Sequence, residues 1–506
     1  MLQTSHLDSL LQASETANAK SPYGSVAKHY RYWNMASHLL DPNRLFPADG
    51  RARAIAQHLY QDIKDLPIIS PHGHTDPQWY AENNYFPDAA ELFLMPDHYI
   101  FRMLYSQGIP MEDMGVPRVD GGPVETDKRK IWRLFAEHFY LFRGTPSALW
   151  LAHVFHEVFG IDKPLGPETA DHYFDYITDT LQTDAYRPRS LMDRFNIEVI
   201  ATTEGATDPL THHKSLSGSA WAKRVITTFR PDDVVDPERK DFLENIETLA
   251  MLTGEDTHSW SGYLGALRQR RADFRACGAT ATDHGHPTAA TADLSAAAAE
   301  ALFHECLEGN VGAEKAELFR AQMITEMAKM SIDDGMILQI HAGARRNYNQ
   351  DVFARFGSDK GADIPSQTNF VDGLKPLLDR YGNEPALSMI AFTLDEDTYS
   401  RELAPLAGHF PCLKLGPPWW FFDSPEGMIR YRERVTETAG FYNTVGFNDD
   451  TRAFLSIPAR HDVARRMDCR FLGTLIAEGR MTEEAGAELA HDLTYRLAKE
   501  SYNLCD

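Results

Sequence analysis

Two pairs of histidines, each with one residue between them, are the residues of this sequence best suited to bind a metal ion. They are His72 with His74, in the stretch SPHGHTDPQW, and His284 with His286. Imidazole nitrogens combined with a carboxylate are common ligands of catalytic zinc, which keeps one coordination position open for water or substrate. A sequence with 21 histidines in 506 residues contains about one His-x-His pair by chance, so either pair alone is weak evidence. The elements around the pairs have to distinguish a metal site from a coincidence.

The first histidine pair follows the apolar run 66–69, which predicts a short buried strand. Seven more short runs of apolar or β-branched residues follow, and helix-patterned segments separate all but the last few of them. These runs begin at Glu198, Val225, Ala279, Met336, Leu387, Cys412 and Tyr442. Strands that alternate with helices in this way predict the α/β class, as a (β/α)8 TIM-type barrel.

Polar side chains follow the end of each predicted strand. In a (β/α)8 barrel the catalytic residues lie on the loops after the carboxyl ends of the strands, so these side chains should converge. In chain order they are His72 and His74, Glu204, Arg230, Asp283 and His284, His341, Asp395, Trp419 and Trp420, and Asp450 with Arg452. An accidental histidine pair has no reason to fall in register with seven other strand ends, so this register favours a site.

The first pair and one aspartate carry the donor atoms of a divalent metal site. His72 and His74 are two residues apart, so both rings can face the same side of a strand end, and Asp450 would add a carboxylate. Asp450 would serve equally well as a helix cap in the stretch NDDT. For His341, a buried, hydrogen-bonded histidine is as good an interpretation as a metal ligand.

Several arginines and two tryptophans are candidates for binding a substrate. The planar guanidinium group of arginine binds both oxygens of a carboxylate at once. The candidates are Arg230, Arg345, Arg346 and Arg452. At least one of the adjacent pair Arg345 and Arg346 is better explained by a surface salt bridge. Trp419 and Trp420 suit the wall of a sugar site, although packing beside two prolines is the commoner role.

The spacing of the predicted strands indicates how the chain is divided. About 120 residues separate the first two strands, more than one crossover helix needs. Helical periodicity around residues 129–142 predicts a helical insertion at about 80–190. We expect residues 46–506 to form the barrel domain and residues 1–45 to form an N-terminal arm. The arm contains Tyr23, Tyr30, Tyr32 and Trp33, which favours packing on another subunit of a homo-oligomer.

The composition argues against several classes of function. A formal net charge of −23 disfavours nucleic acids and anionic membranes as partners, because no positive field would attract phosphates. No stretch approaches the roughly 18 consecutive apolar residues of a membrane helix, and the N-terminus does not resemble a secretion signal. The 5 cysteines are scattered without C-x-x-C spacing, which argues against disulfides and a thiolate zinc site. We therefore expect a cytoplasmic protein that holds any anionic substrate locally through arginines.

From roughly Phe46 to its end, the chain resembles the uronate (glucuronate) isomerases, a family of the amidohydrolase superfamily. The most specific matching motifs are PHGH at the first strand, MPDHYIFRML (95–104), FRPD (229–232), HAGARRN (341–347), WWFFDSPEGM (419–428) and DDTRAFLS (449–456). Several widely spaced motifs in the right order are far more specific than any one of them. The resemblance implies a distorted barrel that interconverts D-glucuronate with D-fructuronate, and D-galacturonate with D-tagaturonate.

The resemblance also implies a role for each matching residue. His72, His74 and Asp450 would hold one divalent metal ion, with zinc favoured. The residues implied to contact the hexuronate are His98, Tyr99, Arg230, His341, Trp420 and Arg452. The expected reaction is proton transfer through a cis-enediol, in which Asp450 is the base and Tyr99 and Arg452 handle the protons on O1 and O2. His98 would be a further active-site group from the helical insertion.

Two features depart from the expected patterns. The family usually has an aspartate two residues before the first histidine, where this chain has Ser70. If that aspartate orients a metal ligand, its loss would weaken metal binding. The fourth strand lacks the bridging lysine, and the sixth lacks the ligand histidine, of two-metal hydrolases in the superfamily. A single metal ion is therefore favoured.

Two other functions fit part of the pattern. A mononuclear amidohydrolase would use the same histidines and aspartate to activate water against an amide or lactone. A non-catalytic protein that binds sugar acids on the same barrel is supported only by Ser70. Such a protein would have little need for the pairs His98-Tyr99 and Asp450-Arg452.

Overall fold

The computed structural model describes residues 40–95, 97–309 and 311–505. Most of the predicted N-terminal arm, residues 1–45, lies outside the described residues, and so do its aromatic residues Tyr23, Tyr30, Tyr32 and Trp33. The arm, its boundary with the barrel domain and its role in a homo-oligomer therefore stay predictions.

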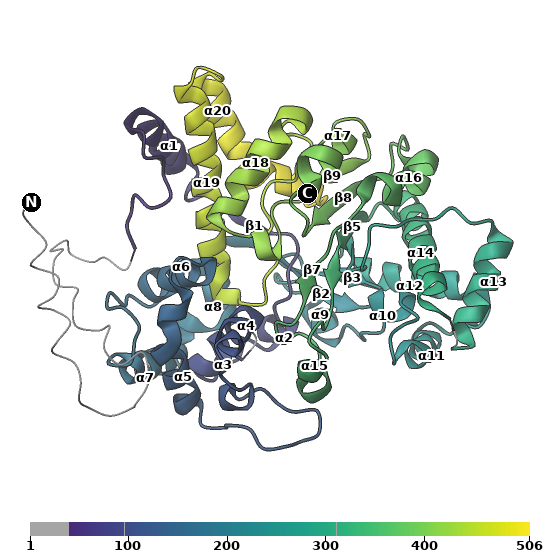
Figure 1. Ribbon diagram of the computed structural model, residues 1–506, viewed down its shortest axis with the longest axis horizontal. Helices are drawn as coiled ribbons and strands as arrows, with labels where there is room; N and C mark the ends of the chain where they lie inside the picture. The colour runs from purple at the N-terminus through teal and green to yellow at the C-terminus, as the bar shows by residue number, and fades with distance from the viewer. Residues whose placement is uncertain (1–39, 96, 310, 506) are drawn as a thin grey trace, which may run out of the picture. The chain divides into compact units, whose positions relative to one another are not determined.

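A seven-stranded parallel sheet forms the centre of the described chain (Figure 1), in the strand order β1-β2-β3-β4-β5-β8-β9. Each strand pairs in parallel with the next. The strands are β1 (Ile68–Ser70), β2 (Ile197–Gly205), β3 (Val225–Arg230), β4 (Ala281–His284), β5 (Ile337–Ala342), β8 (Met389–Thr393) and β9 (Leu413–Leu415). Successive strands of the barrel are neighbours in the sheet, and helices pack outside them. This order confirms the predicted α/β class, a distorted (β/α)8 TIM-type barrel with additional helices.

The eighth predicted strand, residues 442–447, is reduced to a single bridge. In this bridge Thr444 pairs with Leu415 of β9. Among the described residues, no strand pairs with β1 on this side. β1 and β9 are therefore the two ends of the sheet. Thr451 contacts the loop after β1, because the backbone N–H of His74 donates to its backbone carbonyl at 2.9 Å. Residues 444–451, called the seam segment below, therefore close the barrel without a ladder.

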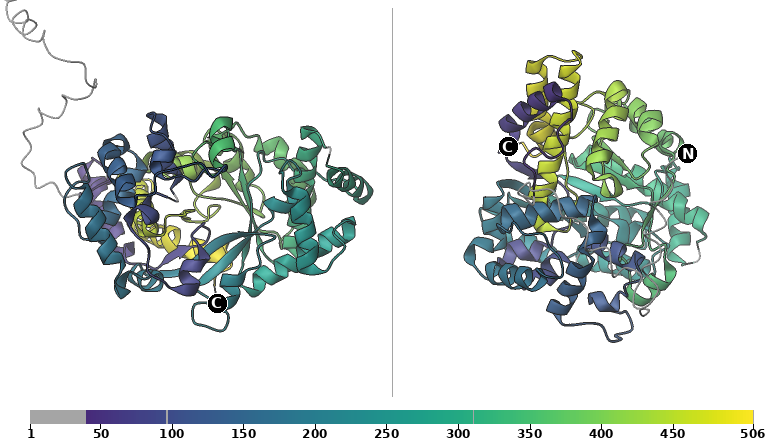
Figure 2. Two further views of the ribbon diagram at one scale, coloured as in Figure 1. Left: turned by 90° about the horizontal axis from the view of Figure 1, so that it is seen from below. Right: turned by 60° about the vertical axis from the view of Figure 1, so that its left-hand side comes forward.

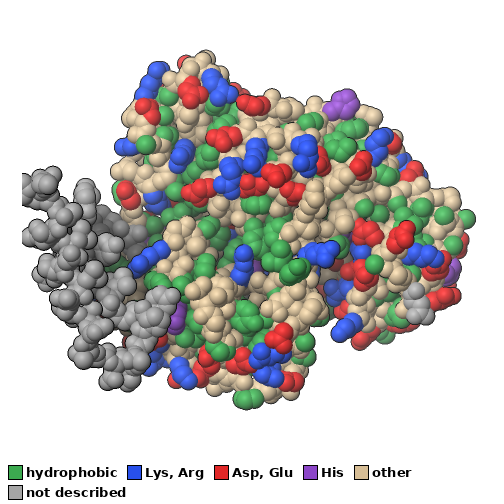
Figure 3. Space-filling view, viewed as in Figure 1, with side chains coloured by type: hydrophobic (Ala, Val, Ile, Leu, Met, Phe, Trp, Pro, Cys, Tyr) green, Lys and Arg blue, Asp and Glu red, His purple; other side chains and the backbone are tan. Residues whose placement is uncertain are grey.

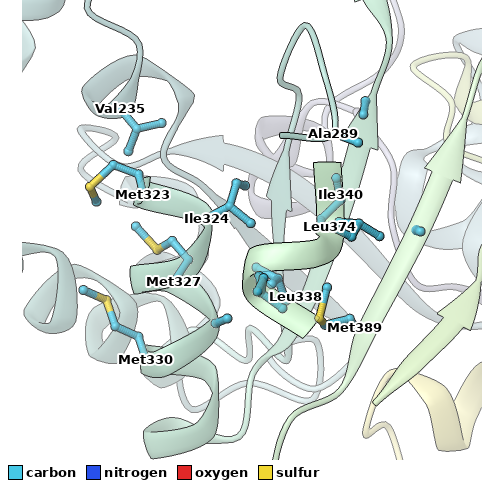
Figure 4. Close-up of a cluster of buried hydrophobic side chains, with 14 of the residues drawn as sticks. Val235, Ala289, Met323, Ile324, Met327, Met330, Leu338, Ile340, Leu374 and Met389 are labelled. Atoms are coloured by element: carbon cyan, nitrogen blue, oxygen red, sulfur yellow. The ribbon is translucent and has the colours of Figure 1, made fainter. Parts of the chain in front are cut away.

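Helices pack on the outer face of the sheet and supply most of the core. They include α11 (Phe242–Thr253), α12 (Trp260–Ala276), α13 (Ala296–Leu307), α14 (Ala313–Asp334), α16 (Phe370–Tyr381) and α18 (Pro425–Ala439). In the cluster drawn in Figure 4, Met323 and Met327 of α14 share a buried apolar core with Leu338 of β5 and Met389 of β8. Helix α14 ends before Gly335, whose φ of +77° suits glycine.

Seven α-helices lie between β1 and β2, where the sequence predicts a helical insertion. They are α2 (Pro77–Glu82), α3 (Ala89–Phe93), α4 (His98–Ser106), α5 (Lys128–His138), α6 (Pro146–His153), α7 (Ala170–Leu181) and α8 (Pro188–Arg194). They share a hydrophobic cluster that includes Trp132, Phe155 and Tyr173 and extends to Ile197 of β2. Aromatic burial of this kind fixes the insertion against the barrel.

Two helices that are far apart in the sequence lie side by side (Figures 1 and 2), α1 (Gly50–Ile63) against α19 (Ile457–Ala477). A Cβ on Gly473 of α19 would lie 2.9 Å from the carbonyl of Ala52, so glycine permits this close approach. Helices α20 (Glu483–His491) and α21 (Leu497–Ser501) complete the chain. None of the described helices is long and apolar enough to cross a membrane. On the face shown in Figure 3, acidic and basic side chains are interspersed.

Candidate active site

A cavity of about 820 Å³ lies at the carboxyl ends of the strands, where barrel enzymes place their chemistry. Every residue to which the family resemblance gives a role lines this cavity: His72, His74, His98, Tyr99, Arg230, His341, Trp420, Asp450 and Arg452. They come from four strand ends, from the seam segment with Arg452 directly after it, and from helix α4 of the insertion. The fold therefore brings together residues from both ends of the described chain.

Three histidines surround the carboxylate of Asp450. His74 Nε2 lies 3.0 Å from Asp450 Oδ1, and His72 Nε2 lies 3.9 Å from the same oxygen. His341 Nε2 lies 3.8 Å from Asp450 Oδ2. One donor atom from each of His72, His74 and Asp450 lies within 4.8 Å of the other two. One cation could contact all three side chains.

The electrostatics of this group suit a divalent cation. Burial lowers the pKa of His72 to about 4, although Asp283 and Asp450 oppose the shift, so this imidazole offers a free lone pair near pH 7. Burial alone would raise the pKa of Asp450, but His72 and His74 outweigh it and hold the pKa below its ordinary value. His341 Nε2 is buried and has no hydrogen-bond partner within the described residues. An unpartnered buried nitrogen beside a carboxylate is expected where a bound group completes the contact. The donor set fits a divalent metal ion.

Asp283, at the end of β4, links this group to Arg230. Its Oδ1 accepts a hydrogen bond from His341 Nδ1 at 2.6 Å. Its Oδ2 lies 3.4 Å from Arg230 Nη1 and 3.7 Å from His72 Nε2. Burial alone would raise the pKa of Asp283, but Arg230 and the histidines hold it well below its usual range. Asp283 is therefore an ionised residue that orients His341, a part that the sequence analysis did not assign to it.

The second histidine pair lies beside this group. His284, His286 and Asp232 also have donor atoms within 4.8 Å of one another. Asp232, however, already accepts a hydrogen bond from Arg230 Nε at 2.9 Å and another from the backbone N–H of Gly285 at 3.0 Å. Because a guanidinium group balances its charge, this second group is less suited to a cation than the first.

Helix α4 of the insertion supplies two aromatic side chains to the cavity. Asp97 caps the helix by accepting from the backbone N–H of Tyr99 at 2.8 Å, which fixes the first turn. The Tyr99 hydroxyl donates to the carbonyl of Trp420 at 3.2 Å, and burial raises its pKa above the ordinary value. The His98 ring stacks on that of Tyr99 at 4.6 Å, and burial lowers its pKa to about 3. At neutral pH the cavity therefore contains a protonated phenol and a neutral imidazole.

A hairpin borders the mouth of the cavity. It consists of β6 (Ala344–Arg345), α15 (Gln350–Phe356) and β7 (Ile364–Pro365). Arg452 Nη2 lies 3.1 Å from Asp359 Oδ2 of this hairpin. The Arg346 guanidinium stands 5.1 Å from the centre of the Trp420 ring. Arg346 lines the cavity, whereas Arg345 is exposed outside it.

Some strand-end residues lie away from the cavity. Thr203 Oγ1 lies 3.4 Å from His72 Nδ1, and neighbouring residues of a strand face opposite sides. Glu204 consequently faces outward, where it accepts from Thr227 and lies 3.9 Å from His213 Nε2 of α9 (Thr211–Leu216). Asp395 instead accepts from the backbone N–H of Thr368 at 3.1 Å. The expectation that every strand end contributes to the site is wrong for these two residues.

Ser70 does not orient a metal ligand through a hydrogen bond. Its side chain is 0% exposed, and its Oγ has no hydrogen-bond partner within the described residues. The closest support for His72 comes instead from Thr203, whose hydroxyl donates to the carbonyl of Gly73 at 2.8 Å.

Comparison with known proteins identifies the family. The family model described as glucuronate isomerase matches residues 51–502. The uronate isomerase of Phenylobacterium zucineum is 62% identical over 465 residues, which are 92% of this chain and 97% of that protein. The crystal structure of the glucuronate isomerase from Caulobacter crescentus has a TM-score of 0.91 at 60% identity, and the match covers 93% of this chain and 98% of that one. The uronate isomerase from Thermotoga maritima matches with a TM-score of 0.85 at 26% identity, covering 92% of this chain and 99% of that one. As its motifs predict, the chain belongs to the glucuronate isomerase family.

Proposed function

We propose that this enzyme interconverts aldo- and keto-hexuronates, D-glucuronate with D-fructuronate and D-galacturonate with D-tagaturonate. Membership of the family supports aldose–ketose isomerisation of uronates. The observation that carries the proposal is one cavity lined by three groups: the histidines around Asp450, the Tyr99 hydroxyl, and the guanidinium groups of Arg230 and Arg452. These are an acid–base set and a set of carboxylate-binding groups, which a proton transfer on a sugar acid requires.

The arginines and Trp420 are proposed to hold the substrate. Arg452 is the arginine best able to exchange its partner for a substrate, because its contact with Asp359 is partly exposed, at 37% and 43% of the two side chains. Arg230 is balanced by Asp232 and Asp283, so it would contribute hydrogen bonds more than net charge. The Trp420 ring would form one wall of the sugar site.

One divalent metal ion, with zinc favoured, is proposed to bind to His72, His74 and Asp450. The support is the convergence of these donors and the unpartnered His341 Nε2. When bound, such an ion would polarise a substrate carbonyl or hydroxyl oxygen as a Lewis acid. A cytoplasmic location and a homo-oligomer stay predictions from the sequence.

The residues of the cavity are proposed to move two protons. Asp450, ionised at neutral pH, would take the proton from C2 while O1 of the aldehyde is protonated, which gives the cis-enediol. Return of the proton to C1 and loss of the O2 proton would then give the ketose. The Tyr99 hydroxyl, protonated at neutral pH, would give its proton to O1 and take up the proton that O2 loses, and Arg452 would stabilise the developing negative charge on these oxygens. His98 would help to position Tyr99 through their stacked rings.

The experiment that tests this function is NMR of the purified protein with D-glucuronate, and separately with D-galacturonate, in deuterated water. We expect ketose that carries deuterium, with the faster substrate defining the preferred epimer. Ketose without deuterium would exclude proton exchange with solvent and point either to a hydride shift or to a transferred proton that is shielded from water. Turnover of an amide or lactone without any ketose would favour the mononuclear amidohydrolase instead.

The role of Asp450 has its own test in the variant Asp450→Asn. Loss of an acid–base group of this kind lowers the rate by about 10²–10⁴-fold, and we expect a loss of at least that size in kcat. Asp395→Asn is the matched control, because Asp395 also follows a barrel strand but does not line the cavity. Near-normal turnover by Asp450→Asn would rule out its assignment as the base.

A further inference from the structure

The backbone that carries Asp450 is not held by a strand ladder. The seam segment pairs with β9 only at Thr444, six residues before Asp450 in the sequence. Asp450 itself has a φ of +36°, in a region that residues other than glycine rarely occupy and that persists only where the surroundings enforce it. Its backbone N–H donates to Asn448 Oδ1 at 2.9 Å. The side chain of Asn448 therefore holds the backbone of Asp450 by a hydrogen bond, as a neighbouring strand holds the backbone elsewhere in the barrel.

Asn448 is held in turn by the C-terminal end of the described chain. Its Nδ2 donates to the Tyr502 hydroxyl at 3.2 Å, and that hydroxyl donates to Gln339 Oε1 at 3.0 Å. Gln339 Nε2 then donates to the backbone carbonyl of Thr282 in β4 at 3.2 Å. Tyr502, Gln339 and Thr282 are 0% exposed and Asn448 is 3% exposed. A buried chain of hydrogen bonds thus runs from the backbone of β4 to the backbone of Asp450.

Each group in this chain has one possible hydrogen-bonding direction. The backbone N–H of Asp450 requires Asn448 to turn Oδ1 toward it, and the carbonyl of Thr282 requires Gln339 to turn Nε2 toward it. The single phenol hydrogen of Tyr502 is then donated to Gln339 Oε1, and the hydroxyl accepts from Asn448 Nδ2. Burial raises the pKa of Tyr502 above its ordinary value, and nearby carboxylates add to the shift, so the hydroxyl keeps its proton. With Nδ2 committed to Tyr502, the amide of Asn448 must turn Oδ1 toward Asp450. Tyr502 is consequently the side chain that anchors the Asn448 amide from the side opposite Asp450.

Packing of the C-terminal helices on the seam segment supports the same connection. Gly446 has a φ of +76°, and a Cβ there would lie 2.8 Å from the carbonyl of Leu493 and 3.3 Å from the backbone nitrogen of Ala498. The ring of Tyr502 belongs to the apolar cluster inside the barrel, together with Phe392 of β8. The last helices therefore contact the seam segment both from outside and through the barrel interior.

We propose that Tyr502 and Asn448 are positioning residues for Asp450, so that the turn after α21 is a functional part of the active site. Tyr502 acts through Asn448, and neither residue touches the substrate. The inference rests on the proposed function in one respect, the assignment of Asp450 as metal ligand and base. It adds that the geometry of Asp450 is set from the C-terminal turn.

The test is a double-mutant cycle with Tyr502→Phe, Asn448→Ala and the double variant. The readout is the zinc dissociation constant of metal-free protein, measured by competition with a chromophoric chelator, together with kcat and KM. Loss of a group that orients a metal ligand typically weakens metal binding or activity by about 10–100-fold. We expect a loss in this range for each single variant, with KM within about threefold of wild type. Because both residues act along one path, we expect the double variant to match Asn448→Ala alone.

Tyr263→Phe is the matched control. Tyr263 is also 0% exposed, and its hydroxyl makes one hydrogen bond, to the carbonyl of Val234 at 2.8 Å, away from the cavity. We expect both tyrosine variants to lower the unfolding temperature alike and only Tyr502→Phe to weaken zinc binding. The proposal is overturned if the two variants change zinc affinity equally, or if the two single effects multiply in the double variant. Failure of the wild type to isomerise either uronate would refute the proposed function instead, and the zinc cycle would still decide the positioning role.

Discussion

Asp283→Asn is the substitution that most directly tests how the site is held together. The carboxylate of Asp283 contacts three groups at once: His341 Nδ1 at 2.6 Å, Arg230 Nη1 at 3.4 Å and His72 Nε2 at 3.7 Å. The substitution keeps the shape of the side chain and removes its charge. It should therefore affect both the free energy of unfolding and the orientation of His341.

The size of the stability change follows from the pairing of Arg230. At an effective dielectric constant of 20, unit charges separated by 3.4 Å attract by about 5 kcal/mol, before desolvation is subtracted. Removing one partner of a buried pair typically costs about 3–5 kcal/mol. Arg230 keeps Asp232 at 2.9 Å, so we expect a loss at the lower end, about 3 kcal/mol. Urea unfolding of the metal-free protein measures it.

The functional change follows from His341. With asparagine at position 283, no charge fixes the proton on His341 Nδ1, and the free Nε2 that faces Asp450 loses its orientation. We expect kcat to fall by about 10–100-fold, the range for partners that orient a metal-site histidine.

Asp232→Asn is the control for this prediction, because Asp232 also pairs with Arg230 but its other oxygen lies 3.9 Å from His286 Nε2 instead of beside His341. It should reduce stability similarly and kcat much less. A kcat within threefold of wild type for Asp283→Asn, or equal losses of kcat in both variants, would refute this reasoning.

Three further predictions concern pH, the phenol and the metal. Burial raises the pKa of Glu204 from 4.5 to about 7, so between these values the unfolded chain releases a proton that the folded chain keeps, and stability falls as pH rises. The total loss in the free energy of unfolding is about 3 kcal/mol, and Glu204→Gln should remove it. Melting curves from pH 4 to 8 check this, and an equal change of melting temperature with pH in both proteins would contradict it. Tyr99→Phe should lower kcat by about 10²-fold with little change in KM, because the ring that stacks on His98 remains; steady-state kinetics on D-glucuronate checks it. Removing the metal with a chelator should abolish isomerisation and added zinc should restore it; turnover by protein with no metal by mass spectrometry would exclude a metal-dependent reaction.

Much of the fold could be predicted because its elements are locally encoded. The buried strands coincide with short β-branched runs, and α14 ends at Gly335, where the backbone needs a positive φ. The eighth strand could not be predicted in this way. Residues 442–447 have the pattern of a strand, but Gly446 turns the chain with a φ of +76° after one bridge. Periodicity reports which residues prefer a strand and does not reveal where the neighbouring strand is missing.

The site was predictable to the extent that it follows strand ends. This rule brought His72, His74 and Asp450 into one group, which the cavity contains. The strand-end rule was wrong for Glu204. A side chain at a strand end can face into the barrel or out of it, and the apolar run in the sequence does not show which side it faces. The rule also gave no indication of Asp283 as an orienting residue or of Tyr502, since their partners are distant in the sequence and no local pattern records such a contact.

The missing eighth ladder leaves one side of the barrel to be held by side-chain packing instead of backbone pairing. The helices and the seven paired strands hold most of the buried apolar surface, so substitutions there change stability. The seam segment contributes Asp450 to the cavity but only one bridge to the sheet. Seven of its eight residues are buried, and Gly446 has no room for a Cβ, so close packing and not a strand ladder keeps Asp450 in the cavity. A random library confined to residues 444–451 should therefore lose folded protein at most positions, as one of equal size in β4 or β5 would.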